Sequence, residues 1–272
     1  MKIKYLYLKL GGSIITDKNK PFTPKDSVIK RLSIEIKKSY DFLKKNQQNT
    51  YRIIIGHGSG SFGHFVAKKY KLKEGKNKIT GVSLIKDESA VLKLNRIILE
   101  SLEKENIPVL PISPLSFMNY NSKEEKFELY SKPILNALKN NIIPLVYGDN
   151  ILDDAGNFYL CSTETIFLEL SRLFKPFKMI FVTDTPVYYV DKETNKKIFM
   201  KKFNPKDIQR IQQNISGYKF DVTGGLLQKL KALIILSKKY KSEIKLIDGS
   251  IRNNLMNEII KNTGVGTVIN YK

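Results

Sequence analysis

Short apolar runs alternate along the chain with longer segments in which apolar residues recur every three or four positions. The short runs predict strands at residues 5–10, 53–55, 109–112, 142–147, 179–182, 244–247 and 267–269. The periodic segments predict helices at residues 23–45, 65–70, 84–105, 132–140, 163–173 and 254–261, with others opening at Asn204-Pro205 and after Gly225. This alternation predicts an α/β fold, with a mainly parallel central sheet covered by helices on both faces.

Two further segments are typical of β-hairpins, residues 151–160 and a stretch around residues 191–195. We expect one domain over residues 1–272, in which Phe174-Lys175-Pro176-Phe177 separates an N-terminal lobe (1–174) from a C-terminal lobe (175–272).

The stretch from Gly56 to His64 directly follows the second predicted strand. It holds four glycines, two serines and both histidines of the chain. A strand that ends in a glycine loop at a helix start brings unpaired N–H groups together, and these favour an anion such as phosphate. The segment matches G-x-G-x-x-G, but it lacks the first-strand position and the later acidic residue of a dinucleotide site. A purely structural turn is the alternative. Two histidines in one loop favour a binding site.

Two more glycine turns occur at comparable places. Lys9 ends the first predicted strand before Gly11-Gly12-Ser13, and Asp221-Val222-Thr223-Gly224-Gly225 precedes the helix that carries Lys229. Lys18 follows the first turn on a polar loop. Glycine turns that each have a lysine or histidine nearby suit a protein that holds several phosphates.

Composition narrows the class of protein. The chain has 47 Lys and Arg against 26 Asp and Glu, a net charge of +21. Such a charge attracts phosphorylated metabolites or nucleic acid, although lysines this evenly spread are also explained by composition alone. The single Cys161 excludes an internal disulfide and suits a reducing cytoplasm. No apolar run approaches the roughly 20 residues of a membrane span, so we expect a cytoplasmic protein without a membrane partner.

Absent motifs also narrow the class of enzyme. The chain has no G-x-x-x-x-G-K-[ST] motif and no H-R-D or D-F-G element, which argues against P-loop enzymes and protein kinases. Phosphoryl transfer depends mainly on positioning and positive charge, and the glycine turns with their lysines meet that need.

The ordered motifs resemble those of the amino acid kinase superfamily. They are Lys9-Leu10-Gly11-Gly12-Ser13, His57-Gly58-Ser59-Gly60-Ser61-Phe62-Gly63-His64, Gly148-Asp149, Thr183-Asp184, and Asp221-Val222-Thr223-Gly224-Gly225 with Lys229. Within the superfamily the chain most resembles the archaeal-type isopentenyl phosphate kinases. The resemblance implies an open three-layer αβα sandwich, usually dimeric. It also implies conversion of isopentenyl phosphate to isopentenyl diphosphate with ATP and Mg²⁺, in isoprenoid biosynthesis of the mevalonate type.

The resemblance implies that the N-terminal lobe (1–174) binds the acceptor and the C-terminal lobe (175–272) the nucleotide. It also assigns roles to matching positions. Lys9 and Lys18 would neutralise the transferred phosphoryl group, and Gly11, Gly12, Ser13 and Gly60 would surround the ATP phosphates. The nucleotide side would also include Asp184, Gly225 and Lys229. The acceptor phosphate would contact Ser59, His64, Gly148 and Thr163, with Lys9, Lys18, His64 and Lys229 in catalysis. No protein metal ligand is predicted, and His57 is interpreted as structural.

The chain departs from the family pattern at two places. Gly58-Ser59-Gly60 replaces three glycines, and Ser162-Thr163-Glu164-Thr165 replaces S-G-D-D near the expected acceptor site. An apolar acceptor tail would need a pocket. Leu84, Val91, Ile112, Phe117 and Met118 are candidates, although core packing explains them equally well.

Two alternatives stay open at this point. The acceptor could be another phosphate or phosphonate such as fosfomycin, or a carboxylate or nucleoside monophosphate. The protein could also be a basic nucleic-acid-binding protein on a degenerate kinase fold. Joint retention of Lys9, Lys18, Asp184 and Lys229 argues against degeneracy, and we expect a small-molecule substrate, no nucleic-acid partner and a homodimer.

Overall fold

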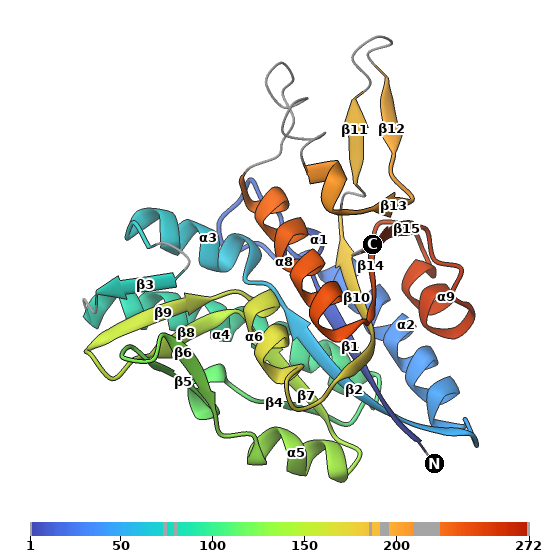
Figure 1. Ribbon diagram of the computed structural model, residues 1–272, viewed down its shortest axis with the longest axis horizontal. Coiled ribbons are helices and arrows are strands. Elements are labelled where there is room, and N and C mark those ends of the chain that lie inside the picture. The colour runs from blue at the N-terminus through green and yellow to red at the C-terminus, as the bar shows by residue number, and fades with distance from the viewer. Residues whose placement is uncertain are drawn as a thin grey trace.

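The computed structural model describes residues 2–72, 75–78, 81–184, 187–190, 196–208 and 224–270, without the side chains of residues 77, 81, 83, 189, 190, 197 and 224–229. Its central sheet has eight strands in the order β13-β15-β14-β10-β1-β2-β7-β4 (Figure 1). These strands are β1 (Lys2–Leu10), β2 (Asn49–His57), β4 (Val109–Pro111), β7 (Ile143–Tyr147), β10 (Pro176–Thr183), β13 (Lys202–Phe203), β14 (Glu243–Asp248) and β15 (Gly266–Ile269). Within this sheet β14 and β15 pair antiparallel and the other neighbours pair parallel.

Helices cover both faces of the sheet, because successive strand residues point to opposite sides. Tyr7 of β1 packs in the core against α5 (Lys132–Lys139), α6 (Thr163–Leu170) and α8 (Gly224–Tyr240). Leu6 and Leu8 pack in a second core against α2 (Asp26–Lys44), α3 (Gly60–Lys69), α4 (Gly81–Lys104) and α9 (Asn254–Lys261). Figure 1 shows α6 and α8 in front of the strands and α2 behind them. The predicted αβα sandwich is confirmed.

Smaller elements extend from the sheet. The hairpin β8 (Asp149–Leu152) and β9 (Asn157–Cys161) confirms the prediction, and β3 (Gly75–Lys78) pairs with its outer strand. The antiparallel pair β11 (Tyr188–Val190) and β12 (Lys197–Phe199) flanks the second predicted turn, whose residues 191–195 lie outside the described part. The sequence analysis missed β3, the hairpin β5 (Met118–Asn121) and β6 (Lys126–Leu129), the single turn α1 (Gly12–Ile15), and the short helix η1 (Pro114–Ser116).

Two predicted helix starts are wrong. The helix expected from Phe65 begins five residues earlier, at Gly60, whose positive φ of 50° lets the chain enter the helix directly from the loop. The helix expected at Thr23-Pro24 begins at Asp26. Pro24 forms a β-bridge with Thr16, so its backbone is extended there and cannot open a helix. Asn204 does precede a helix at residues 205–208, where its side chain accepts the N–H of Lys206.

The two predicted lobes share one sheet, because β10 after the proposed boundary pairs with β1. The division at residue 174 stays a prediction. Among the described residues, no helix is long and apolar enough to cross a bilayer.

Candidate active site

The carboxyl ends of β1, β2, β7 and β10 lie side by side, since these strands are parallel neighbours. Ligands of open α/β sheets bind at this edge, where the loops after neighbouring strands meet. The predicted residues Lys9, Gly11, Ser59, Gly148 and Asp184 all belong to these strand ends or to the loops that follow them. The fold therefore brings together motifs that lie far apart in the sequence.

The first two glycine turns touch backbone to backbone. A Cβ built on Gly12 would lie 2.4 Å from the amide nitrogen of Gly60, and one on Gly58 would lie 2.9 Å from that of Gly12. No side chain fits between these segments. Among the described residues, the N–H groups of Gly12, Ser59 and Gly60 donate to no protein acceptor. Converging N–H groups in a loop that only glycine can form suit phosphate oxygens.

The first turn also joins the end of β10. The Gly11 N–H donates to the Val182 carbonyl at 2.8 Å. The Ser13 hydroxyl donates to Asp184 Oδ1 at 2.6 Å, and Lys18 Nζ lies 2.9 Å from Asp184 Oδ2. Burial favours a higher pKa for Asp184, but the hydrogen bonds from Ser13 and Lys18 outweigh it and hold the pKa below its usual value. Asp184 is therefore ionised and fixes Lys18 at this edge.

Lys9 is buried at the end of β1 and forms an ion pair with Glu164, in the first turn of α6. Both side chains are nearly inaccessible, at 7% and 6% exposure. A buried lysine needs an anionic partner, and Glu164 supplies it. The sequence predicted no role for Glu164.

The predicted acceptor residues lie around α3. Ser59 immediately precedes the helix and its side chain lies against Gly63, where a Cβ would meet its oxygen at 2.3 Å. His64 is exposed in the second turn. Thr163 is buried instead, and its hydroxyl donates to the His57 carbonyl at 2.7 Å. The Gly148 N–H donates to the same carbonyl at 3.2 Å. Gly148 and Thr163 thus hold the end of β2.

His57 is completely buried and stacks on Tyr147, with ring centroids 5.4 Å apart. Asn95 on α4 contacts its Nε2 atom at 3.0 Å. Burial lowers the pKa of His57 to about 4, against a smaller opposing effect of its hydrogen bond with Gly58. His57 is neutral at physiological pH, which agrees with the structural interpretation.

The third glycine turn is described only in part. Gly225 lies in the first turn of α8 and Lys229 one turn later. The side chain of Lys229 and the residues Asp221, Val222 and Thr223 lie outside the described part, so their predicted roles stay predictions.

A pair of acidic side chains was missed by sequence reasoning. Asp149 is fully buried and hydrogen-bonds with Glu88 of α4. Burial, with a further contribution from Glu88, raises the pKa of Asp149 to about 9. Asp149 therefore keeps its proton at neutral pH, and its contact with Glu88 ties α4 to β8. The sequence around Gly148-Asp149 predicts the end of a strand. Nothing in it indicates that the Asp149 side chain contacts Glu88, some 60 positions earlier in the chain.

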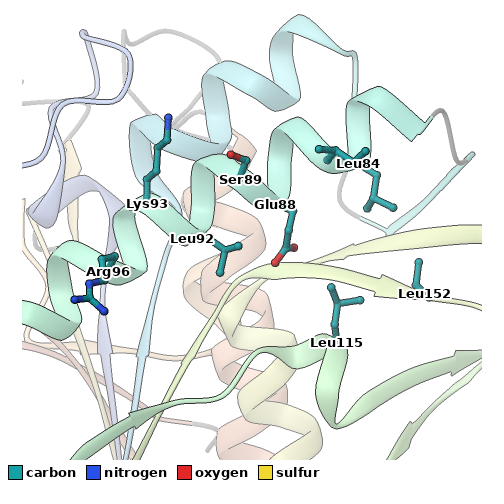
Figure 2. Close-up of a pocket in the computed structure, with 9 residues that line it drawn as sticks. Leu84, Glu88, Ser89, Leu92, Lys93, Arg96, Leu115 and Leu152 are labelled. Atoms are coloured by element: carbon teal, nitrogen blue, oxygen red, sulfur yellow. The ribbon is translucent and has the colours of Figure 1, made fainter.

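An apolar groove of about 640 Å³ lies along α4 on the side that faces η1 and β8 (Figure 2). Its apolar lining consists of Leu84, Leu92, Leu115 and Leu152, and the Glu88 side chain also lines it. Of the five candidates for a tail pocket, Leu84 lines this groove. Val91, Ile112, Phe117 and Met118 are core residues.

Comparison with known proteins identifies the family of this chain. Residues 4–248 match the amino acid kinase family. The chain is 32% identical over 257 residues to the isopentenyl phosphate kinase of Methanocaldococcus jannaschii, covering 93% of this chain and 94% of that protein. It is 25% identical over 268 residues to the isopentenyl phosphate kinase of Thermoplasma acidophilum, covering 97% and 99%.

Solved structures show the same fold. The X-ray structures of isopentenyl phosphate kinase superpose with a TM-score of 0.78 at 22% identity, over 98% of this chain and 100% of that one. The family match spans the strands and loops that carry the site described above. The chain belongs to the amino acid kinase family.

Proposed function

We propose that the protein transfers the γ-phosphoryl group of ATP to isopentenyl phosphate and forms isopentenyl diphosphate. The supporting observation is the close approach of the Gly12 and Gly60 backbones, by which the first glycine turn lies directly beside the N-terminus of α3. The isopentenyl phosphate kinases named above, similar over nearly their whole length, support this acceptor.

Each predicted residue has a role in this proposal. Gly11, Gly12, Ser13 and Gly60 surround the ATP phosphates, with Asp184, Gly225 and Lys229 on the nucleotide side. Lys9 and Lys18 neutralise the moving phosphoryl group. Ser59 and His64 hold the acceptor phosphate, while Gly148 and Thr163 shape that side of the site. An acceptor oxygen attacks the γ-phosphorus in line, the bond from that phosphorus to the β–γ bridging oxygen breaks, and ADP leaves. No general base is required, because a phosphate monoester is already ionised near neutral pH.

Mg²⁺ would bind together with ATP and offset the charge of its phosphates. The described residues contain no group of three or more His, Cys, Asp or Glu side chains arranged to hold a metal ion. The single Cys161 is buried, and a cytoplasmic location stays part of the proposal.

The test is ADP release from ATP and Mg²⁺ with a panel of acceptors: isopentenyl phosphate, dimethylallyl phosphate, fosfomycin, uridine monophosphate, glutamate and water. Strong turnover confined to the isoprenoid monophosphates supports the proposal. Turnover with another acceptor would support the kinase chemistry but not the isopentenyl phosphate assignment. The altered Ser162-Thr163-Glu164-Thr165 segment would then account for the different acceptor. Salt-sensitive nucleic-acid binding without ATP turnover would overturn the proposal.

We also propose a homodimer that covers the groove along α4. Ile85, Leu92, Leu115 and Leu152 are exposed there, and Leu110 is exposed on β4, the edge strand of the sheet. Exposed apolar side chains in a groove, together with an open sheet edge in the same molecule, favour a protein partner over solvent. Leu92→Glu should give a monomer in sedimentation, and Ile235→Glu, which changes a more exposed apolar residue on α8, should not. Equal effects of both substitutions would contradict this interface.

A further inference from the structure

One buried hydroxyl connects the two glycine turns. Thr16 has no exposed surface and ends α1. Its Oγ1 donates to the Gly12 carbonyl at 2.7 Å and accepts the Ser61 N–H at 2.9 Å. Gly12 belongs to the turn on the nucleotide side, and Ser61 lies in the first turn of α3 on the acceptor side. A single atom therefore contacts both halves of the site.

Few side chains can make this connection. A hydroxyl is both a donor and an acceptor on one atom, so it can bind a carbonyl and an N–H at once. Valine has the same shape but neither function. Serine keeps both, without the methyl group.

The glycine at position 60 matches this arrangement. A Cβ on Gly60 would lie 2.2 Å from Thr16 Oγ1 and 2.7 Å from the Gly12 carbonyl oxygen. Thr16 therefore packs where a side chain at position 60 would otherwise be. It also occupies the Ser61 N–H, one of the first free donors of α3, so that the Ser59 and Gly60 N–H groups remain for a ligand.

The surrounding segment strengthens the link. Thr16 pairs with Pro24 in a β-bridge, and the Thr23 N–H donates to Ser61 Oγ at 3.3 Å. On the other side, Lys18 of the same segment pairs with Asp184. The segment from residue 16 to residue 25 is thus attached to α3 and to the end of β10.

In-line phosphoryl transfer requires a fixed distance between the donor and acceptor phosphates, and a misplacement of about 1 Å costs on the order of 100-fold in rate. We propose that the Thr16 hydroxyl is a positioning group that sets this distance by holding Gly12 and Ser61 together. This inference rests on the proposed phosphoryl transfer. It predicts that Thr16 affects the transfer step more than the binding of either substrate.

The test compares Thr16→Val and Thr16→Ser with Thr23→Val in the full-length protein. Thr23 lies in the same segment, but its hydroxyl bonds only to the nearby Pro21 carbonyl among the described residues. We expect Thr16→Val to lower kcat by about 10- to 100-fold, with KM for ATP and isopentenyl phosphate within about threefold. Thr16→Ser should recover most of kcat, and Thr23→Val should resemble the parent protein. Transfer should fall more than ADP release to water.

A second readout does not depend on activity. The Ser61 amide should exchange with solvent faster in Thr16→Val than in the parent, Thr16→Ser or Thr23→Val proteins. Absence of turnover in the parent protein would count against the proposed function and leave this exchange measurement valid. Unchanged kcat or unchanged Ser61 exchange in Thr16→Val would overturn the positioning role, as would equal losses in the valine and serine variants.

Discussion

Glu164 forms an ion pair with Lys9 across the site, joining the first turn of α6 to the end of β1. Both side chains are almost fully buried. In the proposed reaction Lys9 meets a second anion, the moving phosphoryl group, so the carboxylate and the phosphate share one ammonium group. The pair keeps Lys9 oriented before the substrate arrives.

Glu164→Gln should lower the free energy of unfolding by about 3–5 kcal/mol, because it leaves Lys9 buried without its anionic partner. Saturating ATP with Mg²⁺ should restore part of this loss, since phosphate replaces the missing charge. Urea unfolding with and without nucleotide measures both effects. Glu169→Gln is the control on the same helix, where the ion pair with Arg172 is partly exposed. If ATP stabilised the Glu164→Gln variant no more than it stabilises the parent protein, Glu164 would not belong to the phosphate site.

His64→Ala should lower kcat/KM for isopentenyl phosphate by about 10- to 1,000-fold, as expected when a donor to the reacting phosphate is lost. The affinity for ATP should change much less. Steady-state kinetics with each substrate varied in turn measures the difference. Lys68→Ala removes an exposed cation four residues further along α3 and should leave both values nearly unchanged. Comparable losses for both substrates would contradict the acceptor role.

Asp149→Asn should remove a dependence of stability on pH. The pKa of Asp149 is raised to about 9, whereas an unfolded Asp titrates near 4. The folded protein keeps a proton that the unfolded chain releases. The stabilisation is therefore complete below about pH 4 and is lost as the pH rises toward 9. Asparagine supplies a permanent donor to Glu88 in place of that proton.

The measurement is Tm between pH 6.5 and 9. In this window neither Asp87, whose pKa is raised to about 6 by burial, nor His57 contributes a large slope. The parent Tm should fall with pH, and the Asn variant should exceed it by about 3–6 °C at pH 8.5. Asp154→Asn, at an exposed hairpin position, should keep the parent slope. A parallel decline of Tm in the Asp149→Asn variant would show that Asp149 does not hold that proton.

Gly60→Ala should abolish most of the activity and destabilise the fold. Gly60 and Gly156 both have positive φ, of 50° and 77°, where alanine costs about 1–2 kcal/mol. A Cβ at Gly156 meets open space, whereas one at Gly60 meets Thr16 and Gly12. Gly156→Ala should therefore show the conformational cost alone, with full activity. Circular dichroism melts and ADP release distinguish the two variants, and equal behaviour would rule out a special role for the contact.

Local sequence patterns predicted every strand of the central sheet except β13, because short apolar runs indicate buried strands within a few positions. They also placed the glycine turns at strand ends, and parallel pairing then brought those ends together. The missed features depend on distant residues. Thr16 lies 45 positions before Ser61, which it holds, and Glu88 meets Asp149 only after α4 packs beside β8. The expected cap at Thr23-Pro24 failed for the same reason, since the bridge to Thr16 extends the chain there.

The segment from residue 16 to residue 25 reaches Asp184 through Lys18 and Ser61 through Thr16. Because one segment is attached to both halves of the site, we expect ligand binding in one half to change the affinity of the other half. ATP phosphates that compete with Asp184 for Lys18 would act on the same segment that holds the first turn of α3. By linkage, any factor by which ATP changes the affinity for the acceptor equals the factor by which the acceptor changes the affinity for ATP. The segment thereby gives the two substrates a route to cooperative binding within a single chain.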